Sequence, residues 1–149
     1  MKKIRNWILV ADGQRAQVYQ SEGWGHGLQP VEGTHFEGKS AASRKLGTDK
    51  PGRVYSHAHG RASAVGESDS LHRAAKEHFV KSVAGLVDKA SHENAFDRLV
   101  VIAPPEALGE IRATLSDQAK KKIVHELHKD LTHLPLPELQ KQLSELIPL

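Results

Sequence analysis

The chain has 149 residues, 38% of them hydrophobic and 26% charged, which is typical of a single globular domain spanning residues 1–149. The absence of cysteine excludes disulfides, thiolate metal sites and cysteine nucleophiles. A formal net charge of +3 permits a polyanionic partner without requiring one.

The first apolar run, residues 7–11, ends at Asp12 and is shorter than the hydrophobic core of a secretory signal. Nowhere do about 18 apolar residues follow one another, so we expect no helix that inserts into a membrane. These two features predict a cytoplasmic protein.

Three strands are predicted at the start of the chain. Residues 4–11 are apolar enough for a buried strand, and residues 16–20 are its β-branched and aromatic partner. Residues 12–15 between them have the Asp-Gly composition of a tight turn, which predicts a hairpin. A third strand is expected over residues 28–36. It should lie at an edge of the sheet, because Pro30 cannot donate to a central ladder.

The second half alternates helices and strands. Apolar residues from Leu71 to Ala90 recur at helical spacing after capping residues at 68–70, and predict an amphipathic helix. The uninterrupted apolar run within residues 96–103 is typical of a strand covered on both faces. The remaining predicted elements are helices over 106–115, 116–122 and 136–146 and a strand over 123–128.

This order predicts an α/β fold with a five-stranded mixed sheet and helices packed on it. Right-handed crossovers favour the strand order 3-2-1-4-5, which is the ribonuclease H-like arrangement. The carboxyl ends of strands 1, 3, 4 and 5 would then share one edge of the sheet. Ligands of open α/β sheets bind at such edges, so we place the functional site there.

A long loop is predicted over residues 38–69, which contain five glycines and no apolar run long enough for a buried element. Loops of this length are usually functional or disordered. Between residues 38 and 61, six basic side chains face one acid, a local excess of +5. Lys and Arg spaced among glycines suit contact with phosphates. The alternative is a solvated surface loop.

Three segments of the chain, 7–16, 99–112 and 129–135, resemble the bacterial host-attachment protein family. The family name records attachment of bacteria to host cells and implies no reaction. Its members are similar to the middle domain of eukaryotic class-1 peptide-release factors, in which the loop after strand 3 carries Gly-Gly-Gln. This chain has His59-Gly60-Arg61 there, so the resemblance implies a ribosome- or RNA-facing loop without peptide release.

Two sets of residues suggest metal chemistry. His57 and His59 have a spacing that zinc can use, with further ligands to come from His35, His72 or the two aspartates below. Asp12 and Asp130 follow strands 1 and 5 and could hold magnesium for phosphodiester cleavage, with Glu106 and Glu110 as the other acids nearby. The alternative is that both aspartates cap turns. We favour that alternative and predict no metal or cofactor.

The sequence therefore predicts a non-enzymatic protein whose basic loop contacts RNA, the ribosome or another polyanion. The predicted site has a floor of Asp12 and Asp130. The predicted polyanion-binding residues are Arg15, Arg44, Lys45, Arg53, His57, His59, Arg61 and Lys129. Two alternatives stay open: a metal-dependent hydrolase of phosphodiester or ester bonds, and a protein-interaction module, with homo-oligomers formed through the edge strand at 28–36.

Overall fold

The computed structural model describes residues 4–21, 27–38 and 61–146, and gives side-chain detail within α2 from residue 70 onward. Five strands form one sheet in the order β3-β2-β1-β4-β5, as predicted. β1 is antiparallel to β2 and parallel to β4, β2 is antiparallel to β3, and β4 is parallel to β5. The strands are β1 (Asn6–Ala11), β2 (Arg15–Ser21), β3 (Gln29–Glu37), β4 (Arg98–Ile102) and β5 (Ile123–Leu127).

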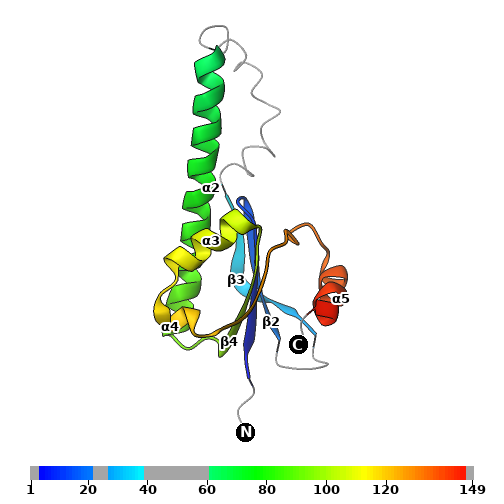
Figure 1. The fold of residues 1–149 in the computed structure, drawn as a ribbon. Coiled ribbons are helices and arrows are strands. Elements are labelled where there is room, and N and C mark those ends of the chain that lie inside the picture. The colour runs from blue at the N-terminus through cyan, green and yellow to red at the C-terminus, as the bar shows by residue number, and fades with distance from the viewer. Residues whose placement is uncertain (1–3, 22–26, 39–60, 147–149) are drawn as a thin grey trace.

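Helices cover both faces of this sheet (Figure 1). Their bounds are α2 (Arg61–His92), α3 (Pro105–Thr114), α4 (Asp117–Lys120) and α5 (Leu136–Leu146). Successive residues of β1 point to opposite faces, so that Leu9 packs with α2, α3 and α4, whereas Ile8 packs with α5. β4 is likewise buried on both faces from Leu99 to Ile102, as its apolar run predicts.

A loop is predicted over residues 38–69, and the predicted end of this loop is wrong because α2 already begins at Arg61. Residues 68–70, expected to cap the helix, lie inside it. A glycine inside a helix lowers stability by only about 1 kcal/mol relative to alanine. Gly66 therefore does not end the helix in which it follows Ala64 and Val65. The basic Lys39–Gly60 segment lies outside the described residues.

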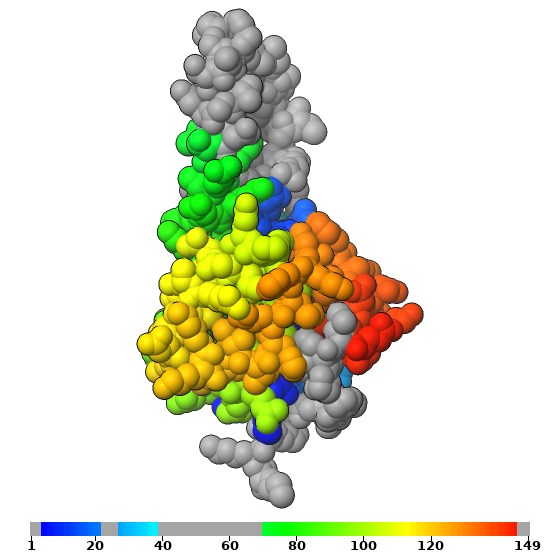
Figure 2. Space-filling model, in the orientation of Figure 1, coloured from blue at the N-terminus to red at the C-terminus, as the bar shows by residue number. Residues whose placement is uncertain are grey.

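The N-terminal half of α2 stands beyond the edge of the sheet (Figure 1). The part of α2 that follows residue 69 projects from the body of the molecule (Figure 2). Leu71 is 68% exposed, and Ala74 and Ala75 are exposed too, although their spacing placed them in the core. Core contact begins at Phe79 and Val80. The apolar periodicity of this helix therefore marks a buried face only in its second half.

β3 is an edge strand, as predicted, and two of its residues discourage pairing with another strand. Pro30 lacks an N–H, and Gly33 adopts a positive φ of 78°. The β2–β3 register also shifts between Gln17 and Tyr19. Proteins use proline and local irregularities of this kind to protect an exposed edge. Homo-oligomer formation through this strand stays a prediction.

The carboxyl ends of β1, β3, β4 and β5 lie at one edge of the sheet, as predicted from their order. The β1–β2 turn, the start of α3 and the segment after β5 meet there (Figure 1). No helix of the described part of the chain has the length and apolar character needed to cross a membrane.

Candidate functional site

Asp12 organises the turn between β1 and β2. One oxygen of its carboxylate, Oδ1, accepts the backbone N–H groups of Gln14 at 2.7 Å and Arg15 at 2.8 Å. Its own N–H donates to the Arg15 carbonyl at 2.9 Å. Aspartate is favoured in tight turns for this hydrogen-bonding pattern. The expectation that Asp12 caps the hairpin turn is confirmed.

The segment after β5 reaches back to this turn through Thr132. The Thr132 hydroxyl lies 3.0 Å from Oδ2 of Asp12 and 2.6 Å from Oδ1 of Asp130. The Thr132 N–H also donates to that Asp130 oxygen at 3.0 Å. Leu131 is only 7% exposed and anchors the segment in the core on the α5 face. Asp130 therefore caps its own turn, as expected, and also faces Asp12.

The half-buried position of Asp12 has opposing effects on its ionisation. Burial alone would raise the pKa of Asp12, because it disfavours the charged form. The hydrogen bonds from Gln14, Arg15 and Thr132 favour the carboxylate and together hold the pKa below its ordinary value. Asp12 is thus a carboxylate at neutral pH.

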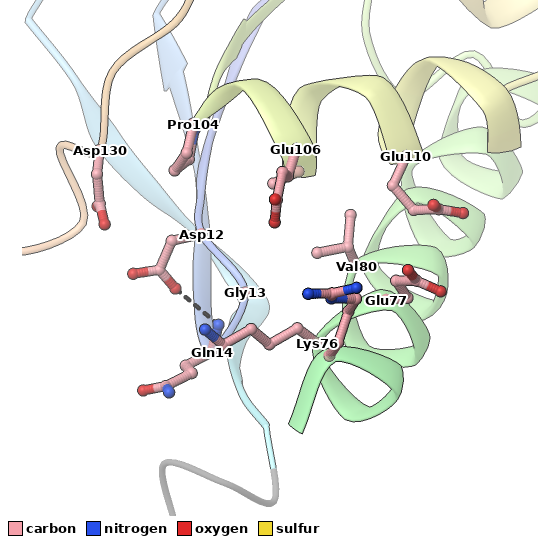
Figure 3. Close-up of a pocket in the computed structure, with 12 residues that line it drawn as sticks. Asp12, Gly13, Gln14, Lys76, Glu77, Val80, Pro104, Glu106, Glu110 and Asp130 are labelled. Carbon is pink, nitrogen blue, oxygen red and sulfur yellow. Dashed lines mark hydrogen bonds between the residues drawn. The ribbon is translucent and has the colours of Figure 1, made fainter. Parts of the chain in front are cut away.

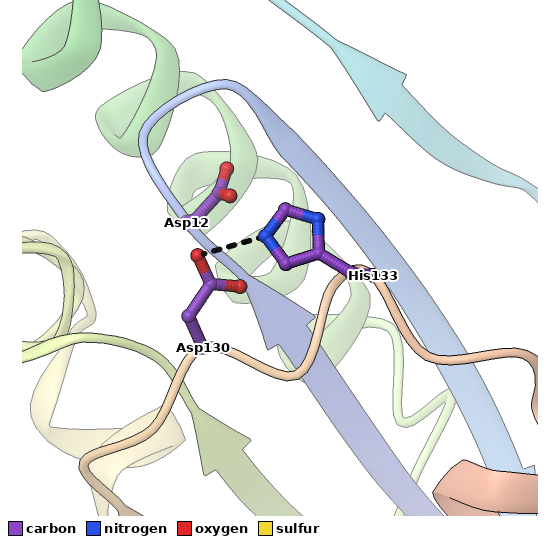
Figure 4. Close-up of side chains that lie close together, drawn as sticks. All are labelled: Asp12, Asp130 and His133. Carbon is purple, nitrogen blue, oxygen red and sulfur yellow. Dashed lines mark ion pairs between the residues drawn. The ribbon is translucent and has the colours of Figure 1, made fainter.

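His133 completes a small cluster with the two aspartates (Figure 4). One potential ligand atom from each of Asp12, Asp130 and His133 lies within 4.8 Å of the other two. Nε2 of His133 is 3.7 Å from Oδ2 of Asp130. On the other side of the ring, a guanidinium nitrogen of Arg15 lies 3.5 Å from Nδ1. Among the described residues, this is the one group of three or more acidic and histidine side chains close enough together to hold a metal ion.

A cavity of about 680 Å³ opens beside the cluster, between the β1–β2 turn, α2 and α3 (Figure 3). Its size is in the range of small-molecule sites. The carboxylates of its lining outnumber the cations by five to two. The carboxylates belong to Asp12, Glu77, Glu106, Glu110 and Asp130, and the cations to Arg73 and Lys76.

α2 approaches the turn closely at Gly13. A Cβ atom at this position would lie 2.8 Å from Cγ and 2.9 Å from Cδ of Lys76. The stem of Lys76 therefore lies over the turn, and its side chain extends from α2 toward the carboxylates (Figure 3). This contact sets the width of the cavity at its α2 wall.

The predicted site residues are only partly brought together by the described structure. Arg15 and the aspartates of the floor meet at the cluster, whereas Lys129 is exposed on the neighbouring segment. Arg61 is the first residue of α2, and its side chain lies outside the described part of the structure. The other five predicted residues also lie outside it: Arg44, Lys45, Arg53, His57 and His59.

Sequence reasoning gave no role to Thr132, His133 or Lys76. Thr132 and His133 belong to the 129–135 segment on which the family resemblance rests, and their closeness to Asp130 in sequence was the available signal. Lys76 carried no such signal, because its place depends on how α2 packs against the turn.

A family model described as "Protein required for attachment to host cells" matches residues 7–143. The chain belongs to this family. The matched region of this host-attachment protein includes the whole Asp12–Asp130–His133 cluster and every described residue of the cavity lining. No curated protein matches the chain.

Proposed function

We propose that this host-attachment protein is a binding protein whose sheet edge, with the basic segment that follows β3, contacts RNA, the ribosome or another polyanion. One observation supports the proposal above the others: the N–H of Gly38 donates to the Gln14 carbonyl at 2.7 Å. The basic segment therefore starts at the same turn that holds Asp12 and Arg15. Lys39 is the first of the five cations in residues 39–60.

The carboxylates that line the cavity limit where a polyanion can bind. Phosphates approaching the cavity meet carboxylates as well as Arg73 and Lys76, so the floor alone repels a polyanion. The attraction has to come from other cations, namely Arg15, Lys129 and those of the basic segment after Gly38. Contacts of that kind release counterions, and the affinity then falls steeply as salt rises.

Fluorescence anisotropy with labelled single-stranded RNA, measured at about 50 and 200 mM salt, tests the proposal. We expect binding at the lower concentration and a large loss of affinity at the higher one. Heparin should compete, because the proposed contacts are with charge and not with bases. Absence of binding at the lower salt concentration would refute the proposal.

Charge-matched variants locate the contact. The double variant Arg44→Ala/Lys45→Ala removes two cations from the basic segment. Lys120→Ala/Lys121→Ala removes the same charge from exposed positions at the amino end of β5, away from the proposed site. We expect the first pair to weaken binding and reduce the salt slope by about 2, and the second pair to have little effect. Equal effects of both pairs would mean that binding is not at this edge.

A second candidate is a hydrolase of phosphodiester or ester bonds, favoured by the approach of Asp12 and Asp130 across Thr132. Two carboxylates can hold a metal ion that activates water and polarises the bond to be cleaved. Hydrolysis of bis(p-nitrophenyl) phosphate and p-nitrophenyl acetate with added magnesium, manganese or zinc tests this. Turnover that is lost in Asp130→Asn would support the hydrolase, and no turnover with any of the three metals would refute it.

A further inference from the structure

The Asp12–Asp130–His133 cluster differs from a patch of surface acids in its composition and in its construction. It joins two carboxylates with an imidazole, and the three donors come from two segments that are far apart in sequence. Asp12 stands on the β1–β2 turn, whereas Asp130 and His133 stand three residues apart after β5. Such convergence of different donor types is what a metal site requires.

Hydrogen bonds hold Asp12 in place, chiefly through one of its two carboxylate oxygens. The backbone N–H groups of Gln14 and Arg15 occupy Oδ1 of Asp12, and Oδ2 is directed toward Thr132. Leu131 fixes the second segment in the core. Asp12 therefore needs little further ordering to bind an ion, which lowers the free-energy cost of binding.

The hydrogen bonds between the two aspartates are short of one hydrogen. The Thr132 hydroxyl has one hydrogen, yet it lies close to oxygens of both Asp12 and Asp130. When both carboxylates are ionised, this hydrogen can serve only one of them. A bound cation would satisfy the carboxylate oxygen that this hydrogen leaves without a donor. The cavity beside the cluster adds three more carboxylates and two cations, while Lys81 pairs with Glu110 and Arg15 lies beside His133.

The donor set also selects among metals. Calcium takes six to eight oxygen ligands and magnesium prefers oxygen, so an imidazole donor favours neither. Carboxylate together with imidazole suits manganese, zinc and similar divalent ions. Two donors on one ion at about 2.1 Å stand roughly 3 to 3.5 Å apart. The exposed side chains of Asp130 and His133 can close the present spacing of up to 4.8 Å by rotation.

We propose that Asp12, Asp130 and His133 bind one divalent transition-metal ion of the manganese and zinc class. The site deepens the hydrolase candidate by naming its third ligand and its metal class, and it is independent of the polyanion proposal. Ligand positions not taken by these three residues would be open to water or to an oxygen of a phosphate or carboxylate.

Calorimetric titration of the chelator-treated full chain with MnCl₂ and ZnCl₂ tests the proposal, using protein without a polyhistidine tag. We expect one ion to bind per chain, with Mg²⁺ and Ca²⁺ weaker by about tenfold or more. Asp130→Asn and His133→Gln should each weaken binding by at least about 10-fold, because loss of an outer-shell partner alone costs that much and these variants remove a ligand. Both residues are exposed, and circular dichroism checks that each variant folds.

Matched controls separate this site from other histidines and acids of the chain. His128→Gln and Asp117→Asn change exposed residues outside the cluster and should leave the affinity unchanged. No binding of either metal, or binding that Asp130→Asn and His133→Gln leave intact, would overturn the proposal. The titration contains neither RNA nor a hydrolysable substrate. An ion that binds without turnover would retain this site and reject only the hydrolase.

Discussion

Replacing Asp12 with alanine is the sharpest test of how the sheet edge is held together. The substitution removes an acceptor from the N–H groups of Gln14 and Arg15 and from the hydroxyl of Thr132. It thereby loosens the β1–β2 turn and cuts the link between that turn and the segment after β5. Both segments form the candidate site.

The size of the effect follows from the kind of bond and its exposure. A hydrogen bond to a charged group contributes about 1.5–3 kcal/mol. Asp12 and its partners are half-buried, so water can replace part of what is lost. We therefore expect Asp12→Ala to lower the free energy of unfolding by about 2–4 kcal/mol, and not by the full sum of three bonds. For a chain of this size, the melting temperature should fall by about 5–15 °C.

Urea unfolding followed by circular dichroism measures this loss, with three further variants as comparisons. Asp12→Asn keeps a side-chain oxygen for the turn and should lose about 1 kcal/mol. Glu93→Ala changes an exposed residue after α2 and should stay within about 0.5 kcal/mol of the parent. Thr132→Val should be less costly in the Asp12→Ala background than alone, because the two residues share a bond.

A loss below about 0.5 kcal/mol in Asp12→Ala would refute the reasoning. So would strict additivity of Asp12→Ala and Thr132→Val, since it would mean that the contact between the two segments does not contribute to stability. Equal losses in Asp12→Asn and Asp12→Ala would show that the turn does not depend on the retained oxygen.

Three other predictions concern the frame around the site. Asp88 accepts the N–H and the hydroxyl of Ser116, bonds that hold the pKa of Asp88 below its ordinary value. The stability that Asp88 adds is therefore present at pH 7 and is lost as the pH falls through this lowered pKa. In urea titrations, the free energies of unfolding of the parent and Asp88→Asn should differ by about 1 kcal/mol at pH 7 and converge below about pH 4. Phe96 is 1% exposed, and Phe96→Ala should cost about 3–5 kcal/mol of unfolding free energy, whereas a loss under about 1 kcal/mol would contradict its place in the core. Gly33→Ala should destabilise by about 1–2 kcal/mol because φ is 78°, whereas Gly109→Ala inside α3 should stabilise by up to about 1 kcal/mol, and thermal melts showing the same sign for both would refute the backbone argument.

Local patterns in the sequence are enough to predict the succession of strands and helices and the order of the strands in the sheet. Turn chemistry at Asp12 and Gly13, the uninterrupted apolar run of β4 and the proline of β3 are local signals, and each reports a short-range physical constraint. The right-handed crossover rule then left few sheet orders. The placement of Asp12 and Asp130 at the same edge followed from those constraints.

The predicted start of α2 is too late because the prediction relies on capping residues at 68–70 and on Gly66 more than on the helix-forming residues around them. Exposure along the helix was misread for a different reason. Leu71 has the spacing of a core residue, but the sheet ends before the helix does, and only the packed structure sets that limit.

Which side chains share the site depends on the packing of segments that are distant in sequence. Thr132 meets Asp12 across 120 residues of sequence, and Lys76 lies over Gly13 because α2 packs beside the turn. His133 lies near the aspartates because Leu131 is buried in the core on the α5 face of the sheet and fixes the position of the residues that follow it. Sequence spacing reports contacts within a strand, a turn or a helix. Contacts between segments depend on how the buried surfaces of those elements fit together, which no local pattern records.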